Sequence, residues 1–131
     1  MAWIFTFNIL GSSGFEHVFV GESKSRKTSG FHGWIYFYQQ EQNGNLDYYG
    51  YQKTVNLGSN MHLVQASFNW NGAVKSSSMF MGTPPELEMA LYTICALTRP
   101  EKSCPMKFGN KSFTIKVFDL DGNIGSAYPQ I

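Results

Sequence analysis

Residues 13–38 read SGFEHVFVGESKSRKTSGFHGWIYFY, and they hold two of the three histidines of the chain, His17 and His32. Each histidine closely follows a Gly-Phe pair, and a polar segment rich in basic residues, Glu22 to Gly30, separates the two. Such a segment is typical either of a solvated turn or of a mobile lid over a site. We expect the rest of the chain to be organised around these two histidines.

Both flanks of the polar segment predict β-strands. Phe15 to Val20 lies between glycines, and Trp34 to Tyr38 is a dense run of aromatic and β-branched residues. Asn43-Gly44 predicts a hairpin turn, because a type I′ turn needs positive φ angles at both central residues. The returning strand is expected at Leu46 to Thr54.

The later strands are expected in pairs, joined by an Asn-Gly turn at residues 71–72 and an Asp-Gly turn at residues 121–122. Their apolar and polar residues tend to alternate, as in a sheet with one buried face. These strands are predicted at Met61–Trp70, Ala73–Met81, Phe113–Leu120 and Ile124–Tyr128.

One helix is predicted among the strands. Thr83 to Glu86 has the form of a capping box with proline at the first helical position. The apolar residues that follow have helical spacing up to about Thr98, which predicts one buried face. That face is expected to comprise Leu87, Ala90, Leu91, Ile94 and Leu97. The order of the elements predicts a single α+β domain, residues 1–131, in which antiparallel β-hairpins pack on one main helix.

The composition is typical of an ordered globular domain. Hydrophobic residues make up 43% and aromatic residues 16% of the 131 residues, and a chain of this length can bury a core without staples. The formal net charge of +1 does not by itself indicate a nucleic-acid partner. No apolar run is long enough to cross a bilayer, and the apolar residues 1–11 are predicted as a strand or a buried lead-in. The sequence does not distinguish a cytoplasmic or nuclear location from a secreted one.

The two cysteines do not form a metal-binding motif, because neither has a CxxC partner or a histidine at ligand spacing. Cys95 lies in the predicted helix and is expected to be a small buried apolar residue, whereas Cys104 is expected in a loop beside a proline. A bridge between the two is an open alternative for a protein outside the cytosol.

The histidine pair suits acid–base chemistry on a phosphodiester. Cleavage of RNA without a metal needs one group to take the proton of the ribose 2′-hydroxyl and another to protonate the departing 5′-oxygen. Two imidazoles, one neutral and one protonated, can do this near neutral pH and predict a bell-shaped pH profile. A lysine can then stabilise the negative charge on the pentacoordinate phosphorus. His17, His32 and a lysine would meet these three demands.

Other interpretations of the same residues stay open. A histidine in a β-rich domain is more often a packing or surface residue than a catalyst. A metal site through His17 and His32 is disfavoured, because their separation along the chain matches no common ligand spacing. His62 lacks the Gly-Phe context and is expected to be structural. Three tyrosines of one predicted strand either stack on bases or cover the surface of the sheet. They are Tyr48, Tyr49 and Tyr51.

Several segments resemble the EndoU family of poly(U)-specific endoribonucleases. The matching segments follow one another in the family's order and cover most of the chain from Ser13 onward. They are SGFEHVFVGE (13–22), GFHGWIYFYQQE (30–41), LDYYGY (46–51), FNWNGAVK (68–75), PPELEMALYTICAL (84–97) and IGSAYP (124–129). The family domain usually has another α+β half before the SGFEH segment, so the resemblance implies that this chain is the C-terminal catalytic half.

The resemblance also implies a role for each matching residue. His17 matches the general acid for the leaving 5′-oxygen, and His32 matches the general base on the 2′-hydroxyl. Lys75 matches the lysine that follows the WNG turn. Glu16 matches an acidic residue that matters in cellular members of the family, where a carboxylate could raise the pKa of the imidazole or help bind a divalent ion. Gly33 stands where a larger polar residue is expected, and we expect it to loosen the loop.

The substrate that the resemblance implies is single-stranded, uridine-containing RNA. Ser126 and Tyr128 match the residues that face the uridine, where a hydroxyl can bond the pyrimidine edge and a ring can pack against the nucleoside. The implied products are a 2′,3′-cyclic phosphate and a 5′-hydroxyl end, released by a monomer. No cofactor is required for this chemistry, although family members are stimulated by Mn²⁺ or Ca²⁺, for which no ligand set can be assigned.

Two rival functions remain open. The first is an RNA-binding module that has lost turnover because the chain is only half of the family domain. The second is a secreted interaction domain in which the motif residues are vestigial.

Overall fold

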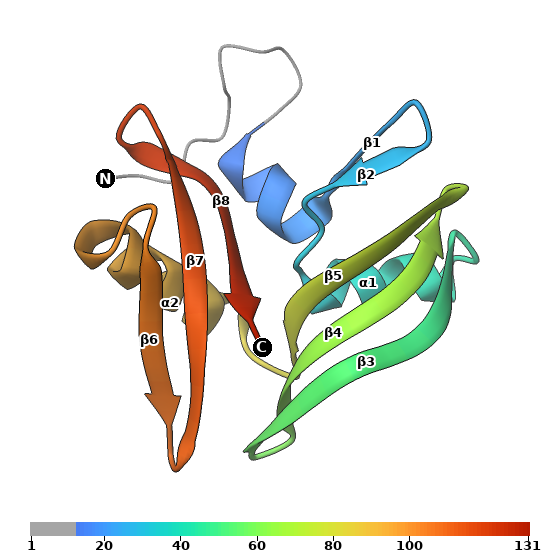
Figure 1. Ribbon diagram of the computed structural model, residues 1–131. Helices are drawn as coiled ribbons and strands as arrows, with labels where there is room; N and C mark the ends of the chain where they lie inside the picture. Colours follow the sequence, from blue (N-terminus) through green and yellow to red (C-terminus); the bar gives the residue numbers. More distant parts are fainter. Residues whose placement is uncertain (1–12) are drawn as a thin grey trace.

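The computed structural model describes residues 13–131, in which two three-stranded antiparallel sheets stand side by side, each with one α-helix against it (Figure 1). The first sheet has the order β3 (Leu46–Gly58), β4 (Met61–Trp70), β5 (Ala73–Met81), and the second has the order β6 (Ser103–Phe108), β7 (Lys111–Leu120), β8 (Asn123–Gln130). The predicted α+β domain with antiparallel hairpins is therefore confirmed. The predicted lead-in, residues 1–11, lies outside the described residues.

Turn chemistry explains the pairing of these strands. Asn71 and Gly72 join β4 to β5, and Asp121 and Gly122 join β7 to β8, and all four residues have positive φ angles. This is the backbone conformation that a type I′ turn requires. Both of these predicted hairpins are confirmed, whereas β6 was not predicted.

The aromatic run after the second histidine is a helix, α1 (Trp34–Gln42), where the sequence predicted a strand. Phe37 of this helix is buried against Phe68 of β4, with ring centroids 5.2 Å apart. Aromatic residues favour strands only when a sheet offers them neighbours on both sides, and here they cover the face of a sheet instead. Gly44, with φ of 77°, follows the end of the helix, so Asn43-Gly44 ends a helix rather than forming a hairpin.

The run that carries the first histidine is also helical. Residues Glu16–Val20 form one turn of π-helix, η1, where the sequence predicted a strand. Ser13 starts this turn, because its hydroxyl oxygen accepts from the Glu16 amide at 3.0 Å and its carbonyl accepts from the His17 amide at 2.9 Å. Such caps satisfy amides that have no partner within the helix.

The basic segment between the histidines is a short hairpin rather than an irregular loop. It consists of β1 (Glu22–Lys24) and β2 (Lys27–Ser29), joined by a turn in which Ser25 and Arg26 have positive φ angles. Its three basic residues, Lys24, Arg26 and Lys27, are exposed.

The predicted helix is present as α2 (Pro85–Thr98), but its predicted buried face is wrong. The buried residues are Glu88, Tyr92, Cys95 and Ala96, whereas Ile94 and Leu97 are 52% and 61% exposed. The helix is therefore rotated about its axis relative to the orientation that the spacing of its apolar residues predicts. Two links to other elements fix this rotation. One is a disulfide between Cys95 and Cys104, whose Cα atoms are 5.7 Å apart, and the other is a bond between Thr83 and Glu88.

Both links differ from the simplest sequence expectation. Cys104 lies on strand β6 rather than in a loop, so the open alternative of a disulfide is the one observed. The Thr83 hydroxyl donates to the Glu88 carboxylate at 2.9 Å and does not cap the helix, whose N-cap residue is Pro84. The capping box prediction is therefore wrong, because its hydroxyl is engaged by the next acidic residue along the helix.

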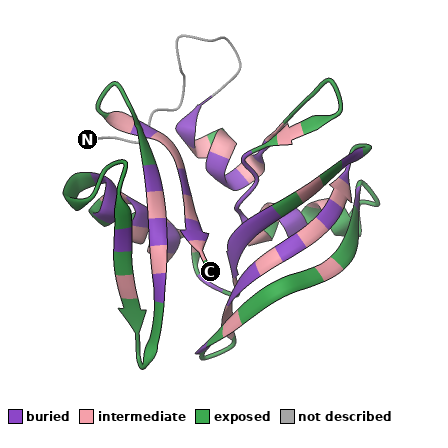
Figure 2. Ribbon diagram, in the orientation of Figure 1, coloured by how far each residue is buried: buried purple, intermediate pink, exposed green. Residues whose placement is uncertain are grey.

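Two apolar cores lie one behind each sheet, and buried residues recur along the central strands β4 and β7 (Figure 2). The first core packs α2 against the second sheet, and it includes Val18 and Phe19 of η1. The second packs α1 against the first sheet, and it includes Phe31. The two histidines are thus each next to a different core. None of the described helices is long and apolar enough to span a membrane.

Candidate active site

Backbone contacts fix the two histidines beside each other. The Phe31 amide donates to the His17 carbonyl at 2.9 Å, and the His32 amide donates to the Val18 carbonyl at 2.6 Å. Gly30 has a φ of 70°, and a Cβ atom at this position would overlap the carbonyl of His17. Only glycine combines this backbone angle with so close an approach.

Gly33 has a similar steric role. A Cβ atom at Gly33 would lie 2.5 Å from the carbonyl oxygen of Phe19, and the residue is buried and bridged to Phe80 of β5. Its φ of −111° is open to any residue, so the requirement for glycine here is one of space. The expectation that Gly33 loosens the loop is wrong, because the missing side chain lets the segment pack against η1.

His32 is buried and held by strand β5. Its Nδ1 atom is 2.6 Å from the Ser78 carbonyl oxygen and 2.9 Å from the Ser77 hydroxyl, which itself donates to the Phe31 carbonyl at 2.7 Å. A carbonyl can only accept, so Nδ1 carries the proton and Nε2 carries the lone pair. This ring can therefore accept a proton at Nε2.

Burial lowers the pKa of His32 to about 3, although the bond to the Ser78 carbonyl opposes this shift. The charges of Lys75 and His17 lower the same pKa further, which means that both side chains lie close enough to act on the ring. His32 is consequently neutral at physiological pH in the free protein.

His17 has a more open and more polar environment. Its side chain is 21% exposed, and its Nδ1 atom is 3.2 Å from Oε1 of Glu22, at the start of β1. A carboxylate in this position orients an imidazole and compensates a positive charge on it. No role in the site was predicted for Glu22, and its place just after the helical turn was the available signal for this contact.

Tyr128 closes one side of the site. Its ring stacks on that of His32, with centroids 5.0 Å apart and planes 21° apart. Ser126 lies two residues earlier on the same strand, β8, so both side chains are on one face of the sheet. Lys75, on β5, is partly buried, and burial lowers the pKa of its ammonium group. The structure thus brings together His17 of η1, Lys75 of β5, Tyr128 of β8 and His32 of the segment before α1.

Strand β7 adds two residues that the sequence did not single out. Lys116 pairs with Tyr128 and Phe118 pairs with Ser126 across the β7–β8 ladder, so the four side chains share one face. The rings of Phe118 and Tyr128 are 6.1 Å apart, and the Lys116 ammonium lies 5.3 Å from the Phe118 ring centroid. This surface continues the site beyond Tyr128, with an aromatic ring and a positive charge.

Other candidate residues lie apart from this cluster. Glu16 is on the exposed side of η1, and its carboxylate has no hydrogen-bond or ion-pair partner among the described residues. His62 is on β4, next to a cavity between α1 and the first sheet. The three tyrosines of β3 are between 43% and 63% exposed and form sheet surface; they are Tyr48, Tyr49 and Tyr51.

A divalent metal would need several oxygen or nitrogen ligands in one place. The described part of the chain contains no group of three His, Cys, Asp or Glu residues arranged to hold one. No ligand set for the divalent ion that the family resemblance implied is therefore assigned among the described residues.

Comparisons with known proteins place this arrangement in context. The family model for endoribonuclease XendoU matches residues 5–129. A uridylate-specific endoribonuclease of Mus musculus is 45% identical over 111 residues, which cover 84% of this chain and 27% of that protein. One from Paralichthys olivaceus is 40% identical over 131 residues, which cover 93% and 34%. The solved structure of XendoU, described as a splicing-independent snoRNA-processing endoribonuclease, matches with a TM-score of 0.72 at 35% identity, over 97% of this chain and 51% of that one.

Proposed function

The chain belongs to the XendoU family of endoribonucleases, and from this we propose that it cleaves single-stranded RNA on the 3′ side of uridine. The observation that carries the proposal is the difference between the two neighbouring histidines. His32 is buried with its proton held on Nδ1, while His17 is partly exposed and in contact with a carboxylate. A base must be neutral and an acid must carry a proton; burial keeps His32 neutral, and Glu22 can compensate the charge of a protonated His17.

In the first step, Nε2 of His32 takes the proton of the ribose 2′-hydroxyl. The 2′-oxygen attacks the adjacent phosphorus and forms a pentacoordinate phosphorane with an additional negative charge. The Ser78 carbonyl and the Ser77 hydroxyl hold the ring in the required tautomer, because both contact Nδ1.

In the second step, the bond from phosphorus to the 5′-oxygen breaks, and His17 gives a proton to that oxygen. The products are a 2′,3′-cyclic phosphate on the uridine and a 5′-hydroxyl on the next nucleotide. Glu22 orients the His17 ring and compensates the positive charge that the ring carries before the transfer. Lys75 stabilises the phosphorane, as the positive group whose charge acts on His32.

Ser126 and Tyr128 are proposed to select uracil. The His32 ring covers one side of Tyr128, so the nucleoside would contact the remaining surface of the tyrosine ring. Ser126 has a hydroxyl on the same face of β8, which can bond the edge of the pyrimidine. Glu16 is a further candidate for substrate contact, because it is exposed beside His17.

These steps use no metal ion. Stimulation by Mn²⁺ or Ca²⁺ stays a proposal that rests on the family resemblance, and it is tested by comparing cleavage with either ion and with a chelator. The active unit is proposed to be a monomer, which analytical ultracentrifugation can check.

The decisive experiment uses a short oligoribonucleotide with a single uridine and a matched oligonucleotide with 2′-deoxyuridine at that position. We expect a cyclic phosphate end from the first and no cleavage of the second, since the attacking 2′-oxygen is missing. Cleavage of the deoxyuridine oligonucleotide would contradict the mechanism. Equal cleavage of oligonucleotides with cytidine or adenosine in place of uridine would contradict the specificity.

A second function has one observation in its favour. The chain spans 26% to 44% of the length of the curated relatives it matches and 51% of the XendoU chain. The residues described here could therefore bind uridine-rich RNA with little turnover. Binding of the uridine oligonucleotide in a titration, without any cyclic phosphate product, would favour this RNA-binding function.

A further inference from the structure

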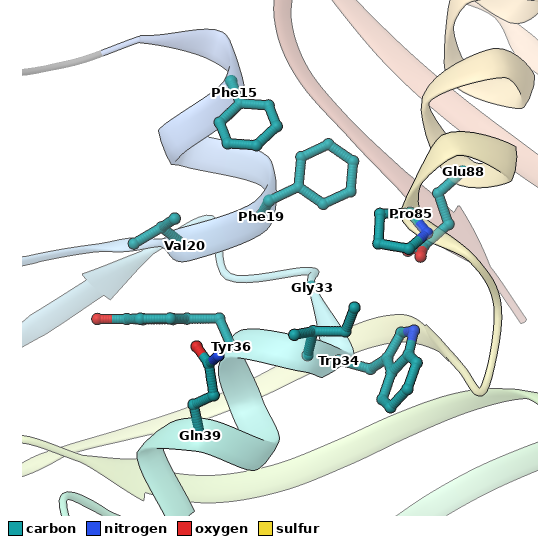
Figure 3. A pocket seen from close by; sticks show the side chains of 10 residues that line it. Phe15, Phe19, Val20, Gly33, Trp34, Tyr36, Gln39, Pro85 and Glu88 are labelled. Atoms are coloured by element: carbon teal, nitrogen blue, oxygen red, sulfur yellow. The ribbon is translucent and has the colours of Figure 1, made fainter.

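A cavity of about 230 Å³ opens between η1, α1 and the first turn of α2 (Figure 3). Phe19 of η1 and Phe15, the residue before η1, line it, and both are two residues from His17. Residues two apart lie on nearly opposite sides of a helical turn, so the cavity is separated from the proposed RNA site by the helix that carries His17. A cavity of this size is larger than one that holds benzene, and it can accommodate one ring with a short chain.

Four aromatic rings contribute to the wall. Phe15 and Phe19 lie on one side, and Trp34 and Tyr36 of α1 lie across from them (Figure 3). The Trp34 ring is fixed in place, because its indole N–H donates to the Thr83 carbonyl at 2.7 Å. Aromatic faces attract organic cations through their negative quadrupole.

Glu88 supplies a buried carboxyl group to this aromatic cavity. Its side chain is 1% exposed, and one oxygen, Oε2, accepts from the Thr83 hydroxyl. The other oxygen, Oε1, is buried without a hydrogen-bond partner among the described residues. Burial raises the pKa of Glu88 to about 8, and the bond from Thr83 opposes this shift. A buried carboxyl oxygen without a partner is unfavourable, so a donor that reaches it would be favourable.

The charge of the wall restricts the ligand. Among the described residues that line the cavity, none carries a basic group, and Glu88 is the only carboxylic acid. An anionic ligand such as a phosphate would therefore face an acid without a compensating cation. A neutral apolar ligand would fill the space and leave Oε1 unsatisfied.

We propose that this cavity is a binding site for an organic ammonium ion that bears one apolar ring. The ring packs among Phe15, Phe19 and Trp34, and the ammonium group donates to Oε1 of Glu88. The site is distinct from the proposed RNA site, and its occupancy does not depend on whether the chain cleaves RNA.

The test compares three probes of nearly equal size, 2-phenylethylammonium, 2-phenylethanol and phenylacetate. Their affinities are measured by NMR titration at about pH 8.5, where a carboxyl such as that of Glu88 is largely ionised and the amine remains protonated. We expect the ammonium to bind about tenfold more tightly than the alcohol, and phenylacetate to bind most weakly. Equal affinities for the ammonium and the alcohol, or no binding of the ammonium, would overturn the proposal, and this series needs no variant.

Substitutions then locate the site. Glu88→Gln keeps the size of the side chain and removes its charge, so we expect the preference for the ammonium over the alcohol to disappear. Glu86→Gln is the matched control, because Glu86 lies on the same helical turn and does not line the cavity. Val20→Phe fills the cavity from η1 and is expected to weaken all three probes. An unchanged preference in folded Glu88→Gln, or unchanged affinities in Val20→Phe, would place the binding elsewhere and overturn the proposal.

Discussion

The regions around the two histidines differ in almost every physical respect, although backbone hydrogen bonds join them. His17 lies on a helical turn, is partly exposed, and contacts the carboxylate of Glu22. His32 lies in a short segment between Gly30 and Gly33, is buried, and contacts only neutral groups through Nδ1. The two histidines thus differ in solvent access and in the charge of their hydrogen-bond partners. These differences suit their proposed roles as acid and base.

Replacing either histidine with alanine should have the largest effect on cleavage and should show how the two regions differ. We expect both variants to lose cleavage by about 10²- to 10⁴-fold, because each removes one proton-transfer group. Their stabilities should differ, because His32→Ala leaves the buried Ser78 carbonyl without a donor and costs about 1–3 kcal/mol. His17→Ala should cost less than about 0.5 kcal/mol.

Cleavage assays and urea unfolding measure the two effects in the same preparations. His62→Ala is the control, since His62 lies on β4 outside the site. Full cleavage by either His17→Ala or His32→Ala would remove that residue from the mechanism.

A substitution that moves the His17 and His32 segments apart should have the next largest effect on cleavage. Gly30→Ala and Gly44→Ala both place alanine at positive φ, at 70° and 77°, but only Gly30 faces a carbonyl within contact distance. We expect Gly30→Ala to be less stable than Gly44→Ala by about 1–3 kcal/mol. We also expect its cleavage to fall by about 10- to 100-fold, because the histidines shift relative to each other.

Both variants bear the cost of an alanine at positive φ. The difference between their unfolding free energies therefore measures the steric cost of the contact at Gly30. Equal unfolding free energies for the two would show that the contact between Gly30 and His17 is not tight in solution.

Removing the charge beside His17 should have a smaller effect. Glu22→Gln retains an oxygen that can accept from Nδ1 but loses the negative charge, so we expect about a tenfold decrease in cleavage. Glu41→Gln, at an exposed position on α1, provides a matched control for the loss of one charge. If both variants cleave equally well, Glu22 only orients the ring.

A last effect is expected on stability as the pH is lowered. The pKa of His32 is about 3 in the folded protein, against the ordinary histidine value of 6.5 for the unfolded chain, so protonation favours unfolding. The contribution of His32 is fully present above about pH 6.5 and is lost as the pH falls towards about 3, by about 1.4 kcal/mol per pH unit.

Unfolding in urea between about pH 6.5 and about pH 5 avoids the titration of most carboxylates. We expect the wild-type chain to lose about 2 kcal/mol more than His32→Gln over this range. Parallel pH dependences for the two proteins would show that His32 is hydrated in solution. The same low pKa moves the acid limb of the cleavage profile, kcat/KM against pH, below the range expected for an ordinary pair of imidazoles.

Features that depend on residues adjacent in the sequence, such as two of the hairpin turns, were predicted correctly. Asn71-Gly72 and Asp121-Gly122 form the expected hairpins, because a positive φ at both positions is a local property. The motifs around His17 and His32 also led to the correct family, and the comparisons confirm that resemblance. The assignments of roles to His17, His32 and Lys75 stay predictions.

Features that depend on tertiary contacts were not predicted. The run beginning at Trp34 has the composition of a strand, and only its packing on the first sheet makes it helical. The rotation of α2 depends on the bond from Thr83 to Glu88, which spacing alone does not reveal. Ser78 contacts His32 from a strand 46 residues further along the chain, so no short motif contains both partners. Glu22 shares a motif with His17, but the two meet only because the segment between them is helical rather than extended.

The stacking of Tyr128 on His32 has a consequence for the order in which the site forms. The two histidines meet through contacts that are short in sequence, and those contacts can form early because little loop entropy opposes them. Tyr128 lies on β8, which follows every other described element along the chain. During synthesis, the histidine pair can therefore exist before the tyrosine emerges from the ribosome. Tyr128 then reaches the histidine pair late, so a nascent chain would carry the proposed acid and base before the residue proposed to recognise uridine.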